Sequence, residues 1–213
     1  GNAFLATKIT FINEIADLCE KVGADVHDVA RGIGLDRRIG AKFLHPGPGF
    51  GGSCFPKDTR ALFETSLAAD APLQIVETVI EINEKRKKAM ATRVINACNG
   101  SLTNKRIAVL GLTFKPNTDD MRESPSLDIL SELIKRGATI RAYDPEGMGE
   151  ARRLLSDVEF CDSSYATLEE ADALVHITEW NEFRALDLDR VKSLMRTPVI
   201  IDLRNIYDPN DMT

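Results

Sequence analysis

The sequence predicts two folds in series: an all-helical first half and a second half built on a doubly wound parallel sheet. Residues 1–100 carry apolar side chains at helical spacing and no alternating strand pattern. From residue 106 onward, short β-branched runs alternate with helical patterns, which is typical of a parallel sheet covered by helices. The segment NGSLTN at 99–104 separates the two patterns, so we expect domains at residues 1–100 and 101–213.

Four helices are predicted in the first half, and the second domain follows the last of them directly. Residues 3–22 have a wide apolar face and a stop at Gly23, and we expect part of that face to pack against a second subunit. Shorter helices are predicted at 25–33 and from about Pro56. Residues 72–98 are predicted to form one long helix of roughly 40 Å that joins the two domains.

Five strands and four helices are predicted to alternate in the second half. The strands are expected at 106–112, 139–145, 158–162, 171–178 and 197–204, and the helices near 125–136, 147–155, 164–170 and 187–195. Ser124 as N-cap, Pro125 as first residue and Gly137 as stop mark the ends of the first of these helices.

In a doubly wound sheet, ligands bind beyond the carboxyl ends of the strands. The candidate binding loops are therefore 111–123, 143–147, 178–183 and 202–205. The first of them lacks the G-x-G-x-x-G dinucleotide fingerprint. It does contain Lys115 and Arg122, two cations suited to phosphate oxygens, although either can equally be a solvated loop charge.

The composition excludes several classes of protein. A net charge of -6 argues against a surface for nucleic acid or anionic membranes, and no apolar run approaches the roughly 18 residues of a membrane span. We expect no signal peptide at the start of the chain. The four cysteines contain no C-x-x-C pair, so neither a metal site nor a disulfide framework is expected. We expect a cytoplasmic protein in which Cys19, Cys98 and Cys161 are small buried hydrophobes.

Cys54 is the exception, because it lies in the glycine-rich segment GPGFGGSCFPKDT at 47–59. Pro56 suits the first turn of a helix, which places Cys54 just before the helix N-terminus, where the helix dipole and Lys57 favour a thiolate. Asp58 lies one helical turn away and can act as a general base through a water. The glycines permit unusual backbone angles and close approach of a ligand. The alternative is a tight turn in which Cys54 is a bystander.

Three segments in this order, residues 1–40, 47–59 and 111–126, resemble the nucleotide-sugar 6-dehydrogenases, and most of all the UDP-glucose 6-dehydrogenases. The resemblance extends from residue 2 to about residue 208. It implies an enzyme with an N-terminal NAD-binding domain, a central helical dimerisation domain, and a C-terminal Rossmann-like domain for the nucleotide of the sugar. The two predicted halves resemble the second and third of these domains.

The resemblance implies oxidation of the C6 alcohol of UDP-glucose to the carboxylate of UDP-glucuronate with two NAD. Cys54 matches the nucleophile that carries a thiohemiacetal and then a thioester. Asp58 matches the residue that positions or activates water, and Asn2 matches an asparagine that stabilises the developing oxyanion. Lys57 and Arg122 match residues that contact NAD.

The remaining matches concern binding of the substrate. The loop over the sugar nucleotide is matched by His45, Pro46, Gly47, Pro48, Gly49, Phe50 and Gly51. Phe114 and Lys115 match nucleotide and diphosphate contacts, and Arg204 matches another substrate arginine. Arg38 matches an arginine that enters the substrate site of the neighbouring subunit, which implies a homodimer.

A catalytic lysine that the family places four residues before the matched asparagine falls outside this sequence. So do the glutamate and the glycine loop of the NAD-binding domain, and we therefore expect the chain to be two domains of a larger enzyme, inactive alone. Two alternatives stay open: a GDP-mannose or UDP-N-acetylhexosamine 6-dehydrogenase, and a non-catalytic nucleotide-sugar-binding module. The joint presence of Cys54, Lys57 and Asp58 favours an enzyme, because binding alone needs none of them.

Overall fold

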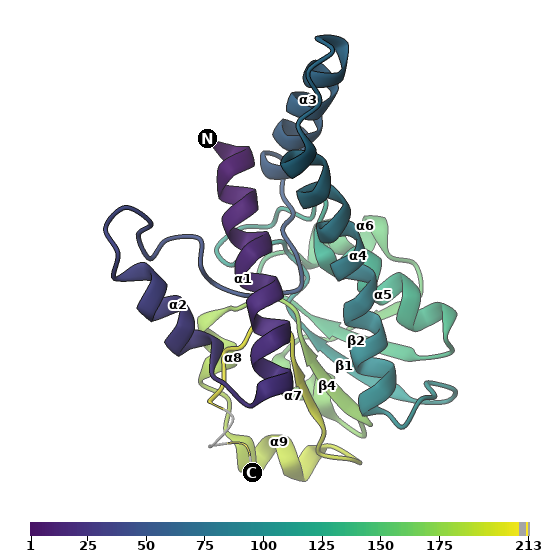
Figure 1. The fold of residues 1–213 in the computed structure, drawn as a ribbon. Helices are drawn as coiled ribbons and strands as arrows, with labels where there is room; N and C mark the ends of the chain where they lie inside the picture. Colours follow the sequence, from purple (N-terminus) through teal and green to yellow (C-terminus); the bar gives the residue numbers. More distant parts are fainter. Residues whose placement is uncertain (209–211, 213) are drawn as a thin grey trace. The chain divides into compact units, whose positions relative to one another are not determined.

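The computed structural model describes residues 1–208 and 212, which divide into a first unit, residues 1–86, and a second unit that starts at Lys87. Both predicted fold classes are confirmed, since helices α1–α4 precede a five-stranded parallel sheet with interleaved helices (Figure 1). No helix in the described part of the chain is long and apolar enough to cross a membrane.

The first unit is built from helices at the positions that the sequence predicts. They are α1 (Asn2–Val22), α2 (Val26–Gly34), α3 (Phe55–Ala68) and the first half of α4 (Gln74–Ala97). Gly23 ends α1 in the left-handed conformation, and the Asp25 side chain caps α2 by accepting from the backbone N–H of His27. The buried side of α1 contributes Ile12, Ala16 and Cys19 to the core of this unit.

The second unit contains a parallel sheet with the strand order β3-β2-β1-β4-β5. Its strands are β1 (Arg106–Leu110), β2 (Thr139–Tyr143), β3 (Val158–Phe160), β4 (Ala173–His176) and β5 (Ile200–Asp202). In the register, Ile107 lies opposite both Ile140 and Ala173. The chain runs outward from β1 through β2 to β3 and then returns to the other side of β1, so the order reverses between β1 and β4.

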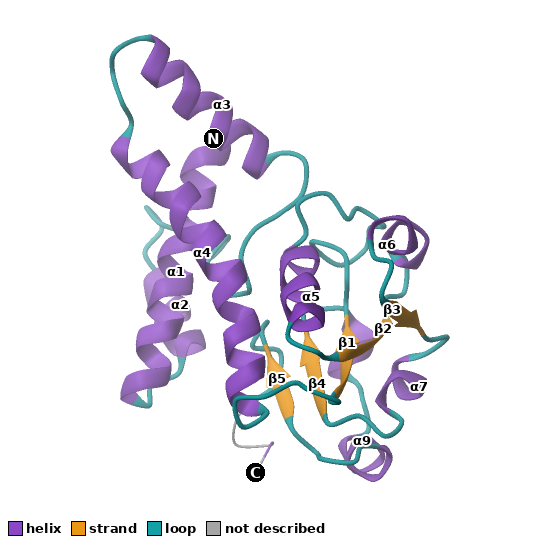
Figure 2. Ribbon diagram, turned by 90° about the vertical axis from the view of Figure 1, so that its right-hand side faces the viewer, coloured by secondary structure: helices purple, strands orange, loops and turns teal. Residues whose placement is uncertain are grey.

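Helices cover both faces of this sheet (Figure 2), and alternate residues of the strands pack against them. Ile107 and Val109 face the last turns of α4 together with α5 (Pro125–Lys135) and α6 (Met148–Leu154). Ala108 and Leu110 face α7 (Ser164–Leu168), α8 (Asn181–Arg184) and α9 (Leu188–Leu194). The short helix α8 was not predicted, and its residues fall partly within the expected binding loop 178–183.

The end of α4 belongs to the core of the second unit, where Met90, Ala91, Val94 and Cys98 are buried. The domain boundary expected at 99–104 falls between the end of α4 and the start of β1, and it stays a prediction about domains of the larger protein. The burial expected for three cysteines is confirmed, since Cys19, Cys98 and Cys161 are buried and free.

Candidate active site

Cys54 is the N-cap residue of α3, and its side chain is exposed to solvent. The helix begins at Phe55, one residue earlier than expected, and Pro56 lies in its first turn as predicted. The Cys54 Sγ lies 3.6 Å from the hydroxyl of Ser53. Among the chain's four cysteines Cys54 alone is accessible, and it lies at the positive end of a 14-residue helix.

The predicted catalytic residues Asn2 and Asp58 contact one another directly. The Asn2 side-chain amide donates a hydrogen bond of 2.6 Å to Asp58 Oδ2, joining the first turn of α1 to the start of α3. Lys57 Nζ lies 3.8 Å from the other carboxylate oxygen of Asp58. Asp58 lies one helical turn beyond Cys54, so three of the polar candidates gather around the N-terminus that carries the thiol.

The glycine-rich loop before Cys54 is buried from Pro46 to Gly52, whereas His45 is exposed. Gly49 and Gly52 have φ values of 126° and 83°, so the prediction that the loop needs glycine backbone angles is confirmed. The Asn83 side chain accepts from the N–H of Phe50 at 2.8 Å and donates to its carbonyl at 3.1 Å. The Asn83 side chain thus pairs with both the N–H and the carbonyl of Phe50, as the backbone of an adjacent β-strand would.

A second clamp on the loop comes from Asn13 and Arg86. Asn13 Oδ1 accepts from the N–H of Gly47 at 2.8 Å, and Arg86 Nε donates to the carbonyl of Gly47 at 2.6 Å. The Arg86 guanidinium also pairs with Asp17 at 2.9 Å. Sequence reasoning missed these residues. A signal existed, because Asn13 and Asn83 each lie mid-helix in an Ile-Asn-Glu tripeptide, and asparagine is unfavourable there without a partner.

Arg38 lies on the outer surface of the first unit, where its side chain is 89% exposed and pairs with Asp36 at 2.6 Å. Hydrogen bonding from Arg38 lowers the pKa of the Asp36 carboxyl. Lys8 Nζ donates to the carbonyls of Ile39, Gly40 and Lys42 at 2.9, 3.2 and 2.7 Å and thereby ties down the segment that presents Arg38. The structure therefore points this arginine outward.

In the second unit, three predicted substrate residues meet beyond the carboxyl ends of β1, β4 and β5. Arg204 donates to the carbonyl of Phe114 at 3.0 Å and to the carbonyl of Ile177 at 2.7 Å. Lys115 Nζ lies 5.3 Å from the centre of the Phe114 ring. These residues flank the point between β1 and β4 where the strand order reverses, which is the usual ligand crevice of such a sheet.

Arg122 lies in the same loop as Phe114 and Lys115 but pairs with Asp120, with 2.8 Å between Nη2 and Oδ2. Hydrogen bonding from Arg122 lowers the pKa of the Asp120 carboxyl. The Asp120 carbonyl in turn accepts from the N–H of Phe114 at 3.2 Å. The loop after β1 is therefore folded back on itself, with its arginine at the surface.

Side chains to which sequence reasoning gave no role in the site hold the loop after β1 in place. Ser124 and Ser126, at the start of α5, both donate to the carbonyl of Leu112, at 2.6 and 2.5 Å. The Thr178 hydroxyl donates to the carbonyl of Thr113 at 2.6 Å. At Gly111 (φ 91°) a Cβ atom would lie 2.5 Å from the backbone nitrogen of Thr178, so only glycine allows the two loops to approach this closely.

Comparison with known families gives two matches along the chain. Residues 1–85 match the central domain of the UDP-glucose/GDP-mannose dehydrogenase family, and residues 108–209 match the UDP-binding domain of the same family. Two of the similar curated proteins are UDP-glucose 6-dehydrogenases from Rhizobium meliloti (strain 1021), 61% identical over 212 residues, and from Bacillus subtilis (strain 168), 50% identical over 213 residues. Both matches span the whole chain but cover only 48% and 46% of the relatives, so the chain spans about half their length.

Solved structures agree with these matches. A UDP-glucose dehydrogenase from Pyrobaculum islandicum is 36% identical with a TM-score of 0.88, covering 99% of this chain and 47% of that chain. A UDP-D-ManNAc dehydrogenase from Pyrococcus horikoshii is 30% identical with a TM-score of 0.84, covering 98% of this chain and 47% of that chain. The chain therefore belongs to the UDP-glucose/GDP-mannose dehydrogenase family, of which it carries the central and the UDP-binding domains.

Proposed function

We propose that the chain supplies the nucleophile and the nucleotide crevice of an enzyme that oxidises UDP-glucose to UDP-glucuronate. The observation that carries this proposal is the accessible Cys54 at the N-terminus of α3, beside the hydrogen-bonded pair Asn2 and Asp58. Among the nucleotide sugars handled by this family, UDP-glucose is favoured because the relatives at 61% and 50% identity are named UDP-glucose 6-dehydrogenases.

Covalent capture explains why a thiol is needed for this reaction. A first loss of two electrons and two protons converts the C6 alcohol to the aldehyde. The Cys54 sulfur then adds to this aldehyde, a C–S bond forms, and the thiol proton passes to the former carbonyl oxygen to give a thiohemiacetal. Loss of two electrons and two protons from this adduct gives a thioester. Water then adds to the thioester carbonyl, the C–S bond breaks, and the carboxylate leaves with Cys54 restored as a thiolate.

Asn2 and Asp58 are assigned to two steps of this reaction, stabilisation of the oxyanion and activation of water. One N–H of the Asn2 amide donates to Asp58, which leaves its second N–H to stabilise the oxyanion formed at C6. The Asp58 carboxylate accepts a proton from the attacking water, and its hydrogen bond with Asn2 fixes its orientation.

NAD would supply the two-electron acceptor for both oxidations. The described residues fit contacts to such a dinucleotide rather than a complete site for it. Lys57 and Arg122 both carry largely exposed cationic side chains suited to its phosphate oxygens, but the loop after β1 lacks the glycine fingerprint. We therefore assign binding of most of the cofactor to a part of the enzyme outside this chain.

The crevice of the second unit is assigned to the UDP moiety. Lys115 and Arg204 are assigned to the diphosphate, Arg204 as a largely buried cation that also pairs with Glu179 at 3.0 Å. The Phe114 ring provides an apolar face for the nucleoside. The glycine-rich loop, residues 45–51, is assigned to the sugar, because its backbone is held rigidly by Asn13, Asn83 and Arg86.

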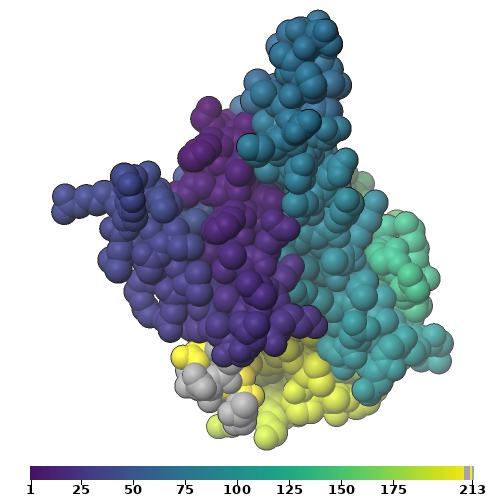
Figure 3. Space-filling view, viewed as in Figure 1, coloured from purple at the N-terminus to yellow at the C-terminus, as the bar shows by residue number. Residues whose placement is uncertain are grey.

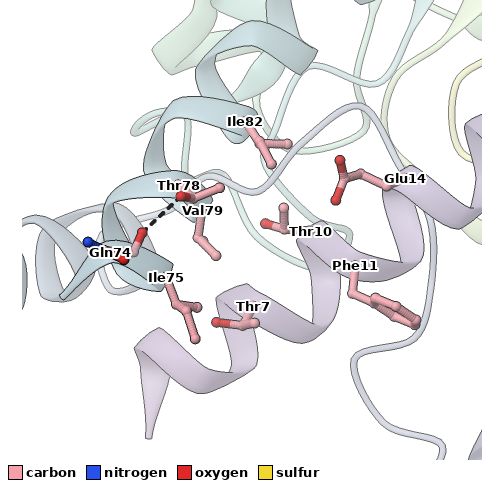
Figure 4. Close-up of a pocket in the computed structure, with 9 residues that line it drawn as sticks. All are labelled: Thr7, Thr10, Phe11, Glu14, Gln74, Ile75, Thr78, Val79 and Ile82. Carbon is pink, nitrogen blue, oxygen red and sulfur yellow. Dashed lines mark hydrogen bonds between the residues drawn. The ribbon is translucent and has the colours of Figure 1, made fainter.

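The first unit is assigned to a homodimer in which Arg38 reaches the substrate site of the second copy. Large apolar side chains along α1 are exposed, namely Phe4, Phe11, Leu18 and Val22, and the surface of α1 is visible in Figure 3. Beside them a groove of ≈ 400 Å³ lies between α1 and the first turns of α4 (Figure 4). An apolar surface of this kind suits a protein partner.

Four free cysteines, none in a disulfide, support a reducing compartment such as the cytoplasm.

A ligand panel tests the function and the choice of sugar together. UDP-glucose, UDP-N-acetylglucosamine and GDP-mannose are each titrated against the chain while its thermal unfolding is followed. Ligand at about 100 times its Kd stabilises a protein by roughly 2.7 kcal/mol, which is a measurable shift. We expect UDP-glucose to give the largest shift, and Arg204→Met to reduce it. A larger response to either other sugar would change the substrate, and no response to any of the three would overturn the proposed function.

A further inference from the structure

Asp144, the residue that follows β2, is a carboxylate buried to 1% exposure at the carboxyl ends of the strands. Its Oδ1 accepts from the backbone N–H groups of Glu146 and Gly147 at 3.1 and 2.7 Å. Its Oδ2 accepts from the backbone N–H groups of Leu112 and Thr113 at 2.7 and 3.1 Å. The two oxygens thus join the loop after β1 to the loop after β2.

The loop after β4 is joined to the same carboxylate. The indole N–H of Trp180 donates to Asp144 Oδ2 at 3.2 Å. The hydroxyl of Thr113 lies 3.2 Å from this oxygen and 3.0 Å from the carbonyl of Lys115, so its single proton serves one of them. A buried carboxylate is costly unless donors surround it, and here donors from three loops do so.

This arrangement differs from that of a dinucleotide-binding fold with the same strand pattern. There, an acidic residue beyond β2 binds the ribose, and backbone N–H groups after β1 bind the pyrophosphate. Here the acidic residue after β2 and the backbone N–H groups after β1 bind each other, because Asp144 accepts from the N–H groups of Leu112 and Thr113. Neither group is available to a ligand, so the residues that can contact a nucleotide are the next ones along the loop, Phe114 and Lys115.

We propose that Asp144 is a positioning residue for nucleotide binding, whose carboxylate takes the anion position of the β1 turn and thereby sets the loop that presents Phe114 and Lys115. The Thr113 carbonyl, which accepts from Thr178, and the Phe114 carbonyl, which accepts from Arg204, both depend on this loop conformation. The inference rests on the proposed role of the crevice in binding a nucleoside diphosphate.

The chain offers a matched control at the other end of the strands, where they begin. Asp172 precedes β4, is 5% exposed, and accepts from the backbone N–H of Arg106 at 2.8 Å and from Arg196 at 3.3 Å. Asp144→Asn and Asp172→Asn both replace a carboxylate oxygen that accepts from buried N–H groups with an NH₂ group that cannot accept. Both should therefore lower the melting temperature. Only Asp144→Asn changes the loop that carries Phe114 and Lys115.

The test is calorimetric titration of UDP into the 213-residue chain and the two variants, well below their melting temperatures. We expect Asp144→Asn to raise the Kd for UDP by about tenfold or more, and Asp172→Asn to leave it at the wild-type value. The emission of Trp180, the single tryptophan, should also change in Asp144→Asn and not in Asp172→Asn, because its indole N–H loses a carboxylate partner.

A milder pair covers the case in which Asp144→Asn does not fold. Thr113 and Thr167 are both fully buried threonines, and Thr167 lies on α7, on the face of the sheet covered by α7, α8 and α9. Thr113→Val should raise the Kd for UDP by roughly threefold, whereas Thr167→Val should not change it. Wild-type affinity for UDP in Asp144→Asn and Thr113→Val would overturn the positioning role and leave the proposed function standing. No UDP binding by the wild-type chain would overturn both.

Discussion

Cys54 differs from the other cysteines in its surroundings, and this difference can be measured. It is exposed at the N-terminus of α3, whereas Cys98 and Cys161 are buried, and burial raises the pKa of both of these thiols. We expect brief treatment of the native protein with iodoacetamide, followed by peptide mapping, to modify Cys54 first. Unfolded protein, in which all four thiols are exposed, is the control for differences between the peptides. Labelling of Cys54 no faster than that of Cys98 would contradict an accessible nucleophile.

His176 is a second residue whose protonation should be visible in the intact protein. It is fully buried in β4, its Nε2 lies 3.3 Å from the Tyr207 hydroxyl, and its Nδ1 has no hydrogen-bond partner. Burial lowers the pKa of His176 from 6.5 to about 3. Between these values the unfolded chain binds a proton that the folded chain does not, so the free energy of unfolding falls as the pH falls from 6.5 toward 3.

The expected loss from this one residue is about 2 kcal/mol at pH 5 relative to neutral pH. His176→Leu removes the group that titrates, so the variant should lose correspondingly less stability between these two conditions than the wild type. Urea unfolding followed by Trp180 emission, which reports on the same unit, measures both proteins at both pH values. Other titrating groups are common to the two proteins and cancel in the difference. Equal losses in the two proteins would show that His176 does not remain neutral in the fold.

At the scale of elements, the glycine-rich loop depends on α1 and α4, with which it makes side-chain contacts. Asn83 makes two hydrogen bonds to the backbone of Phe50, and both partners are buried. Asn83→Ala leaves a buried N–H and a buried carbonyl without partners, so we expect it to lower the free energy of unfolding by about 2–3 kcal/mol. Asn96→Ala, an exposed site on the same helix, is the control and should be nearly neutral. Denaturation followed by far-UV circular dichroism measures both, and equal effects would contradict the clamp.

The sequence predicted elements well where a single period governs them. The helix predicted at 3–22 from its amphipathic pattern, and the helix predicted at 125–136 from its cap residues, both have ends within one or two residues of those in the structure. Strand ends were placed too far along the chain, as at 106–112, because apolar residues such as Leu112 continue into the buried loop beyond Leu110. The helix α8 was missed because its four residues are too few to show a period.

The candidate site was predictable only in part, for a physical reason. Cys54, Lys57 and Asp58 are close in sequence, so their proximity follows from helix geometry. The contact between Asn2 and Asp58, and the role of Asp144, depend on elements far apart in sequence that meet only in the fold. Family resemblance named Asn2 and Asp58 as separate candidates but did not predict their contact, whereas the proposed positioning role of Asp144 rests only on its hydrogen bonds.

At the scale of the whole molecule, the distribution of exposed apolar side chains is uneven. Among the described residues, large exposed apolar side chains lie in the first unit, apart from Leu154 on α6. On α1, Phe4, Phe11 and Leu18 recur every seven residues and so share one face of the helix. A monomer would leave this face in water, whereas a second copy of the chain would bury it against the same face of its partner.

Leu18 and Leu154 allow this assembly to be tested with matched variants, because each is a leucine with 56% of its surface exposed. A glutamate at position 18 would bury a charge in the proposed interface, which we expect to weaken the dimer at least about tenfold. A glutamate at position 154 would remain in solvent and should leave the assembly unchanged. Light scattering at micromolar concentration should give about twice the 23.5 kDa chain mass for the wild type and Leu154→Glu, and a lower mass for Leu18→Glu. A wild-type mass of one chain would remove the dimer, and with it the assignment of Arg38 to a partner's site.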